Sequence, residues 1–471
     1  MTPTCDHGVT RVQDPAFEAW LEGQLRHSAR EMLASISPLS IVKQRPGFAQ
    51  TVRPIAGAIV ASPVLGDWKP EPDYFFHWFR ESAVVIDALR LLHVERHVGD
   101  DALRHLHDFV RFSLALNRLD GRVLAAQADR RARVAPEFLQ YLREDRELAT
   151  IHGDAVAADT RVNADGTLDI SRWSRPQHDG PPLRALALLR WIASARLDDA
   201  LLADAADLLR FDLAFTLRHW REPSYDIWEE ECGQHYYTQR VSAAALAAGA
   251  AWLERLGDTA QAGRCHDEAQ AALRLLDGYW VDEAPGADAT HGYYRSRVPV
   301  AGGSGAKALD IAVILAAIHG AGTEAAGAPA PHGCADPRMH ATLARLDALF
   351  DAAYPINHGR PAQHGAALGR YAGDVYFSGG AYYFSTLGAA EFCFRAAVAC
   401  GDARDWFARG NAYLATVRAY TPPSGDLSEQ FDQRSGEQTS ARHLAWSYAA
   451  FISCVHARRM AAAAREAPQR R

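Results

Sequence analysis

The chain has 471 residues, of which 48% are hydrophobic and 23% charged, a balance typical of a globular protein. Its formal net charge is −7 and lysine occurs only at Lys43, Lys69 and Lys307, so it lacks the basic stripe that a phosphate backbone requires. No segment offers about 18 uninterrupted apolar residues or the apolar centre of a signal peptide. We therefore expect no nucleic-acid partner, no membrane contact, and a cytoplasmic location unless a leader was removed.

The seven cysteines are scattered and form no CxxC pair, which predicts reduced thiols. Residue types that bind metals gather at His332, Cys334, Asp336 and His340, but in a region rich in Ala, Gly and Pro and without the spacing of a zinc site. A surface loop is therefore favoured there. No metal and no other cofactor is predicted.

Helical periodicity and clusters of helix-breaking residues predict about twelve helices along the chain. We expect them to begin near Phe17, Glu81, Ala102, Pro182, Asp198, Thr238, Asp258, Lys307, Arg338, Gly380, Ala403 and Gln438. The odd members are amphipathic, whereas the even members are apolar on nearly every side, which is typical of buried helices. Six outer and six inner helices in alternation predict an all-α fold, an (α/α)6 barrel of six outer–inner hairpins that forms one domain over residues 1–471.

Polar, aromatic-rich loops precede each predicted inner helix. They cover residues 73–80, 173–180, 226–235, 302–305, 370–379 and 428–436. These loops should gather at the N-terminal ends of the inner helices, where polar groups on a packed scaffold can form a pocket. Residues 322–337 are expected to form a flexible connection. We identify no starch-binding module and no Ser/Thr-rich linker.

Two carboxylate-bearing segments stand out among these loops. Residues 225–231 place Glu229 and two further glutamates beside Trp228; this pattern also fits an acidic helix start, but a carboxyl group against an indole can be kept protonated as an acid. Glu429 lies in the second segment, where Ser428 could alternatively be a helix N-cap. Together the two glutamates could supply the acid and base that cleave a glycosidic bond, and aromatic residues on the same loops suit stacking on sugars.

Six ordered motifs resemble those of glycoside hydrolase family 15, the glucoamylases. They are DYFFHWFR (73–80), WSRPQHDGP (173–181), YDIWEE (225–230), GRYAGD (369–374), SEQFD (428–432) and GEQTSAR (436–442). The likeness runs from about residue 46 to residue 458, and it implies the same (α/α)6 barrel. It further implies that Glu229 is the general acid and Glu429 the general base.

The resemblance also implies the residues that bind the sugar. Sugar hydroxyls would be held by Arg80, Asp226, Glu230 and Arg370, and the nucleophilic water by Tyr74 and Gln430. The pocket would be lined by Trp78, Trp173 and Tyr382, with Trp228 beside the acid and with Glu81, Arg175 and Asp374 as further contacts. The implied activity is exo-acting, inverting release of β-D-glucose from the non-reducing ends of α-1,4-linked gluco-oligosaccharides by a monomer.

Three departures from the family pattern leave the substrate open. Glu81 replaces a usual Asp, Tyr382 replaces a common Trp, and Gly373 replaces a common acidic residue. A related enzyme acting on α-1,6-glucans or trehalose is therefore the main alternative. A catalytically silent sugar-binding barrel would normally lose one of the two glutamates, and a terpenoid-cyclase-like barrel would favour an Asp-rich run that this chain lacks.

Overall fold

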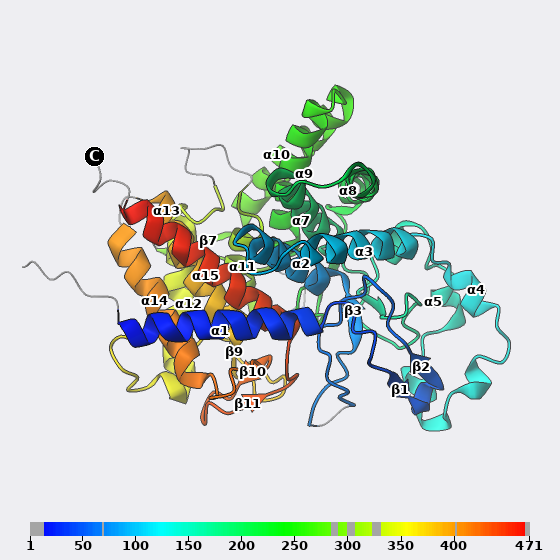
Figure 1. The fold of residues 1–471 in the computed structure, drawn as a ribbon, viewed down its shortest axis with the longest axis horizontal. Helices are drawn as coiled ribbons and strands as arrows, with labels where there is room; N and C mark the ends of the chain where they lie inside the picture. Colours follow the sequence, from blue (N-terminus) through cyan, green and yellow to red (C-terminus); the bar gives the residue numbers. More distant parts are fainter. Residues whose placement is uncertain are drawn as a thin grey trace, which may run out of the picture.

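A computed structural model describes residues 14–67, 70–283, 291–298, 307–322, 331–400 and 403–466 (Figure 1). Within these ranges, twelve helices of eight or more residues alternate along the chain between an outer and an inner layer. The outer helices are α1 (Pro15–Ala34), α3 (Asp101–Leu116), α8 (Asp199–His219), α10 (Thr259–Leu276), α12 (Pro337–Ala353) and α14 (Ala403–Tyr420). The inner helices are α2 (Phe79–Val94), α7 (Gly180–Ser194), α9 (Tyr236–Arg255), α11 (Ala312–His319), α13 (Tyr383–Ala399) and α15 (Ala445–Glu466).

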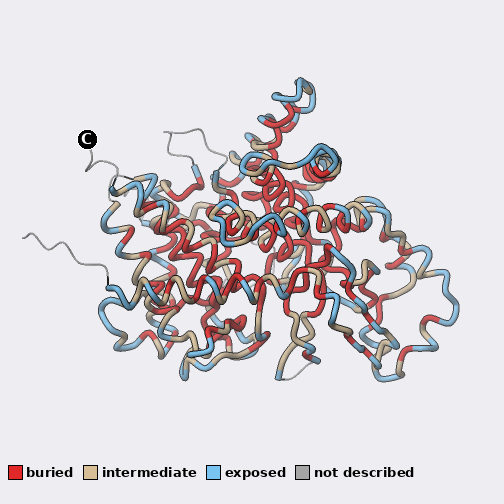
Figure 2. Tube along the Cα trace, in the orientation of Figure 1, coloured by how far each residue is buried: buried red, intermediate tan, exposed pale blue. Residues whose placement is uncertain are grey.

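The inner helices form a closed ring. Helix α2 packs on α7, α7 on α9, α9 on α11, α11 on α13, α13 on α15, and α15 again on α2. Figure 2 shows the buried trace concentrated in this ring and the exposed trace on the outer helices and loops. The predicted (α/α)6 barrel is confirmed.

Burial explains the division into two layers. Fourteen residues of α13 are buried, including small residues such as Gly388 and Ala389, whereas α10 buries five residues along one stripe. An inner helix contacts neighbours on all sides, so it tolerates few charged residues, while an outer helix needs one apolar face only. The hydrophobic periodicity therefore separates the layers correctly.

Ten of the twelve helices begin within three residues of the predicted position, and two begin later. Helix α11 begins at Ala312 rather than near Lys307, because Asp310 bridges to Tyr371 and its carboxylate accepts from the Ala312 N–H at 2.8 Å. Helix α15 begins at Ala445 rather than near Gln438. The intervening residues form a short strand and then a turn with positive φ at Ser440, so they cannot continue a helix.

Short strands tie together the loops at one end of the ring. Strand β3 (Phe76–Trp78) pairs with β4 (Arg161–Asn163), β5 (Ser224–Tyr225) with β6 (Cys232–Gly233), and β10 (Gln430–Phe431) with both β9 (Ala381–Tyr382) and β11 (Gln438–Thr439). Elsewhere β1 (Lys43–Arg45) pairs with β2 (Gln50–Val52), and β7 (Trp280–Asp282) with β8 (Gly292–Tyr294). The predicted loop at 302–305 lies outside the described residues.

Residues 117–178 form an insertion between α3 and α7, drawn mainly in cyan in Figure 1. The insertion carries α4 (Gly121–Ala125), α5 (Asp145–Leu148) and α6 (Asp154–Ala157), and residues such as Val156, Val162 and Leu168 pack with Phe75 and Phe79 in a second apolar cluster. Its short elements lack a clear period, and the sequence did not predict them. Across the described ranges, none of the helices combines the length and hydropathy of a membrane span.

A buried ion pair joins inner helix α7 to outer helix α8. Arg184 donates to both carboxylate oxygens of Asp212, at 2.9 and 2.6 Å, and the two side chains are 1% and 0% exposed. We expect Asp212→Ala to lower the free energy of unfolding by about 3–5 kcal/mol, because it leaves a buried guanidinium unpaired. Urea unfolding near neutral pH measures the change.

The matched control is Asp129→Ala, which breaks an exposed pair with Arg133 and should cost about 0–1 kcal/mol. The double replacement Arg184→Met/Asp212→Leu should recover most of the loss, because it removes both buried charges. A double variant as unstable as Asp212→Ala would show that packing, rather than the unpaired charge, sets the cost.

Candidate active site

A cavity of about 500 Å³ opens among the loops at the N-terminal ends of the inner helices. Its lining residues include charged, hydroxyl-bearing and aromatic side chains, among them Tyr74, Trp78, Arg80, Glu81, Trp173, Trp228, Glu229, Glu230, Arg370, Tyr376, Tyr382 and Glu429. Both predicted catalytic glutamates therefore face one cavity. Phe384 of α13 and Trp446 of α15 also line it and stack on each other with ring centroids 4.3 Å apart.

A tight turn presents Glu229 to the cavity. The carboxylate of Asp226 accepts from the backbone N–H groups of Trp228 at 3.1 Å and Glu230 at 3.0 Å, while its carbonyl accepts from the N–H of Glu229 at 2.9 Å. Glu229 has φ of 65°, a conformation that a non-glycine residue adopts only where its surroundings hold it. Asp226 is thus behind the cavity wall, where it organises the turn.

Three donors contact the carboxylate of Glu229. The indole of Trp78 donates to it at 2.8 Å, a guanidinium nitrogen of Arg80 donates at 3.0 Å, and the indole of Trp173 donates to the second oxygen. Trp78 and Arg80 stand at the start of α2, and Trp173 lies in the loop before α7. The carboxylate is therefore held at the meeting point of three loops.

Arg80 is 2% exposed and is bonded in several directions. Besides Glu229, it donates to Asp179 at 3.0 Å, to Gln177 at 3.2 Å and to Glu81 at 3.1 Å. A buried guanidinium needs such partners, because removing it from water is costly. Arg80 thereby fixes the loop before α7 against the first turn of α2.

Glu81 presents an oxygen without a hydrogen-bond partner in this cluster. Its Oε1 accepts from Arg80, whereas Oε2 is buried and makes no hydrogen bond. Burial raises the pKa of Glu81 to about 7; Arg80 opposes the rise, and the charge of Glu229 adds to it. Since Glu81 lines the cavity, it is available as an acceptor or a donor for a sugar hydroxyl.

Glu429 has a different environment, built from hydroxyl groups. Ser440 donates to one carboxylate oxygen, and the hydroxyl of Tyr74 lies 3.4 Å from the other and 2.7 Å from the hydroxyl of Tyr376. Burial raises the pKa of Glu429 to about 7, although Ser440 and, less directly, Arg370 lower it.

Arg370 forms the second cationic centre of the cavity. It donates to both oxygens of Asp374, at 2.7 and 2.6 Å, and to Glu230 at 3.0 Å. Glu230 also accepts from Tyr371 at 2.5 Å and from Lys307. Burial opposes ionisation of Glu230, but Arg370 and Lys307 hold its pKa below the ordinary value.

Trp228 lines the same cavity as Glu229, but its indole nitrogen bonds to a different carboxylate. It donates to Asp310 at 2.9 Å, and burial raises the pKa of Asp310 to about 7. The indoles that bond to Glu229 are those of Trp78 and Trp173. A role for the Trp228 ring beside the acid therefore stays a prediction.

Four predicted contacts stand behind the cavity wall: Arg175, Asp226, Asp374 and Gln430. Arg175 pairs with Asp169 at 2.9 Å and with Asp159, whereas Gln430 donates to the hydroxyl of Tyr382 at 2.7 Å. Asp226, Asp374 and Gln430 contact residues of the cavity, whereas the partners of Arg175 lie outside it, and the other predicted site residues line the cavity.

Several residues that complete the site were not singled out from the sequence: Asp179, Lys307, Asp310, Tyr376 and Ser440. Tyr376, Asp179 and Ser440 lie in loops or motifs that the sequence did mark. Lys307 and Asp310 carry no comparable signal, because their partners are about 80 residues away along the chain.

An (α/α)6 barrel whose end cavity combines two glutamates with aromatic walls has the architecture of a carbohydrate-active helical barrel. The family model described as Glycosyl hydrolases family 15 matches residues 157–456, and the chain belongs to this family. The glucoamylase of Neurospora crassa is 28% identical over 446 residues, which cover 85% of this chain and 63% of that protein. The chain thus spans less than two thirds of that relative.

Two further comparisons also find similarity to glucoamylases. The intracellular sporulation-specific glucoamylase of Saccharomyces cerevisiae is 25% identical over 501 residues, which cover 93% of this chain and 83% of that protein. The solved structure of Hormoconis resinae glucoamylase matches with a TM-score of 0.72 and 26% identity, over 93% of this chain and 73% of that chain.

The buried carboxyl of Glu429 should cost stability when it ionises. Its folded pKa of about 7 exceeds the ordinary 4.5, so the cost is absent at low pH and grows as the pH rises from 4.5 through 7. We expect Glu429→Gln to raise the free energy of unfolding at about pH 9 by up to roughly 3 kcal/mol, with no gain at about pH 4. Urea unfolding at both pH values measures this difference.

The exposed Glu437→Gln serves as the control and should change stability little at either pH. A loss of stability in Glu429→Gln at about pH 9 would contradict the prediction, since it would mean that the ionised carboxylate contributes favourably there.

Proposed function

We propose that this chain is an exo-acting, inverting hydrolase that releases β-D-glucose from the non-reducing ends of α-1,4-linked gluco-oligosaccharides. The observation that carries the proposal is that Glu229 and Glu429 line one cavity with aromatic walls. Two carboxyl groups are the chemical requirement of most glycosidases, and aromatic faces bind sugar rings. Family membership and the glucoamylase relatives support the same activity.

In this proposal Glu229 protonates the glycosidic oxygen and Glu429 removes a proton from the attacking water. The hydroxyls of Ser440 and Tyr74 orient the carboxylate of Glu429, so that its remaining acceptor positions are available to the water. The water attacks the anomeric carbon opposite to the leaving oxygen, which inverts the configuration. Such a scheme requires the two carboxyl groups about 6.5–9.5 Å apart.

Substrate binding would prepare the acid. Before sugar binds, Glu229 shares Arg80 with Glu81 and Asp179. A terminal glucose whose hydroxyls bond to Arg80 would compete for that guanidinium. An oxygen of Glu229 released from Arg80 would then be free to face the glycosidic oxygen that it protonates in this proposal.

The remaining site residues divide by position. Those that line the cavity would contact the sugar: Tyr74, Trp78, Arg80, Glu81, Trp173, Trp228, Glu230, Arg370 and Tyr382. Arg175, Asp226, Asp374 and Gln430 would position them. Phe384 and Trp446 at the cavity's helical end favour entry of one chain end, hence exo action.

We also propose that the protein is a monomer with one catalytic domain. We propose an intracellular location, because the name of the S. cerevisiae relative states that location for that protein.

The type of glycosidic linkage that the enzyme cleaves should depend most on Glu81 and Tyr382. Glu81 lines the cavity, and its buried Oε2 has no hydrogen-bond partner; a sugar hydroxyl that reached this carboxyl group would favour α-1,6-glucans or trehalose over α-1,4-linked chains. Glucose release from maltose, maltoheptaose, isomaltose, panose and trehalose under the same conditions separates these activities. We expect the highest kcat/KM with the α-1,4-linked substrates. No release from any of them would support a silent sugar-binding barrel instead.

Glutamine variants test the two catalytic roles. Glu229→Gln and Glu429→Gln should each lose most of the roughly 10²–10⁴-fold that one positioned acid or base contributes, while binding is kept. With α-glucosyl fluoride, whose leaving group needs no proton, Glu229→Gln should regain activity and Glu429→Gln should not. Proton NMR in the first minutes should show β-glucose from the parent.

The exposed Glu437→Gln is the control for these assays and should keep parental activity. Rescue of Glu429→Gln rather than Glu229→Gln by the fluoride substrate would exchange the two roles. Initial α-glucose would exclude the inverting scheme.

The pKa of Glu429 predicts the acidic limb of the pH profile. A base works in its ionised form, so kcat/KM should fall as the pH decreases through about 7. The hydrogen bond from Ser440 lowers this pKa, and Ser440→Ala should therefore move the limb upward by about one pH unit. Initial rates across the pH range measure the shift.

Ser435→Ala, an exposed serine that bonds to Asp432, is the matched control and should leave the profile unchanged. A limb that stays in place or moves to lower pH in Ser440→Ala would contradict the assignment of this limb to Glu429.

A further inference from the structure

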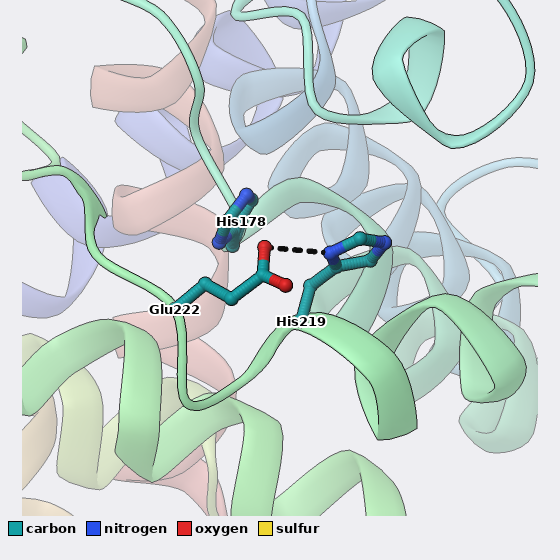
Figure 3. Close-up of side chains that lie close together, drawn as sticks. All are labelled: His178, His219 and Glu222. Carbon is teal, nitrogen blue, oxygen red and sulfur yellow. Dashed lines mark hydrogen bonds and ion pairs between the residues drawn. The ribbon is translucent and has the colours of Figure 1, made fainter.

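Three metal-binding residue types meet behind the active site, where the loop before α7 approaches the end of α8. His178, His219 and Glu222 each offer one ligand atom, and these atoms all lie within 4.8 Å of one another. Figure 3 shows the three side chains converging from the loop, the last residue of the helix and the turn that follows it. No residue of this group contributes to the cavity described above.

His219 has a carboxylate at each ring nitrogen. Its Nδ1 lies 2.9 Å from Glu222 Oε2, and its Nε2 lies 2.8 Å from Asp154 Oδ2. A neutral imidazole can donate through only one nitrogen, so the other would face an acceptor. A metal ion at Nδ1 removes this conflict, since histidines that bind metals commonly donate their second N–H to a carboxylate.

His178 supplies a buried group that is available for binding. It is 4% exposed, and its Nδ1 has no hydrogen-bond partner. The Glu222 side chain is 55% exposed, which leaves an approach from solvent.

We propose that His178, His219 and Glu222 bind one divalent transition-metal ion of the Zn²⁺ type, with Asp154 orienting His219. Two imidazoles and one carboxylate suit zinc or its neighbours better than Ca²⁺ or Mg²⁺, which prefer oxygen ligands. Bonds of about 2 Å place the ligand atoms of one tetrahedral ion roughly 3.4 Å apart, so the side chains must close by about 1 Å. The one proton of the neutral His219 ring then lies on Nε2, where it bonds to Asp154, Nδ1 offers its lone pair to the metal, and water completes the coordination.

The ion would fasten a segment on which the cavity depends. His178 lies between Gln177 and Asp179, which both accept from Arg80. A metal bound to His178 and to the end of α8 therefore anchors this loop to an outer helix. Because the ion binds the folded chain, it should raise the melting temperature, by an amount that grows with the logarithm of its concentration relative to its Kd.

Metal binding by the whole chain tests the proposal. Protein freed of metal with a chelator is titrated with Zn²⁺ by calorimetry and with Co²⁺ by visible absorption, and bound metal is counted by mass spectrometry. We expect one ion per chain, an absorption spectrum typical of four-coordinate Co²⁺, and a higher melting temperature with Zn²⁺. Glu222→Gln keeps the side-chain size at an exposed position, and Asp154→Asn keeps the shape of the orienting residue.

Glu222→Gln should weaken Zn²⁺ at least as much as Asp154→Asn, for which the expected loss is about 10–100-fold. His107→Ala, which removes a partly exposed histidine beside Asp108, is the control and should bind like the parent. Less than half an ion per parent chain, or equal Zn²⁺ affinity in the parent and Glu222→Gln, would overturn the proposal. Tighter binding of Ca²⁺ than of Zn²⁺ would overturn it as well.

Discussion

The buried guanidinium of Arg80 is the constraint around which the active-site loops are arranged. Its charge is 2% exposed at the start of an inner helix, and such a charge is tolerated only when partners surround it. Those partners come from the helix itself, from the loop before α7 and from the turn before α9, as Glu81, Asp179 and Glu229. The loops must converge for Arg80 to be paired, and their convergence is what encloses the cavity.

A second buried cation, Arg370, also pairs with carboxylates other than Glu429, so Glu229 and Glu429 have different electrostatic surroundings. Arg370 is paired with Asp374 and Glu230, and Arg80 contacts Glu229, so both cations are already engaged with other carboxylates. Glu429 is left with hydroxyl partners, and burial raises its pKa to about 7. One cavity therefore holds two glutamates in contrasting surroundings, which is how proteins separate the roles of paired carboxyls.

The sequence predicts the barrel well because burial is periodic. An inner helix such as α13 must be apolar on all sides, and that requirement is visible in the order of its residues. The six family motifs coincide with five of the six polar loops that stand at a regular place in this pattern. The roles of individual side chains were less predictable: Trp228 bonds to Asp310, and Asp226 holds a turn, because φ of 65° at Glu229 redirects its neighbours. The His178 cluster could not be recognised from a spacing in the sequence, because His178 lies 41 residues before His219.

Ionising a buried carboxyl group with a raised pKa lowers the free energy of unfolding, and the packing of the inner helices has to offset this loss. Glu81, Asp310 and Glu429 each have a pKa of about 7, so each disfavours the folded state increasingly as the pH rises toward that value. Water cannot relieve this cost without entering the cavity wall. The stacked pair of Phe384 and Trp446 comes from two adjacent inner helices and lines the same cavity. Closed helical packing beneath the cavity thus supports the wall in which these carboxyl groups are buried.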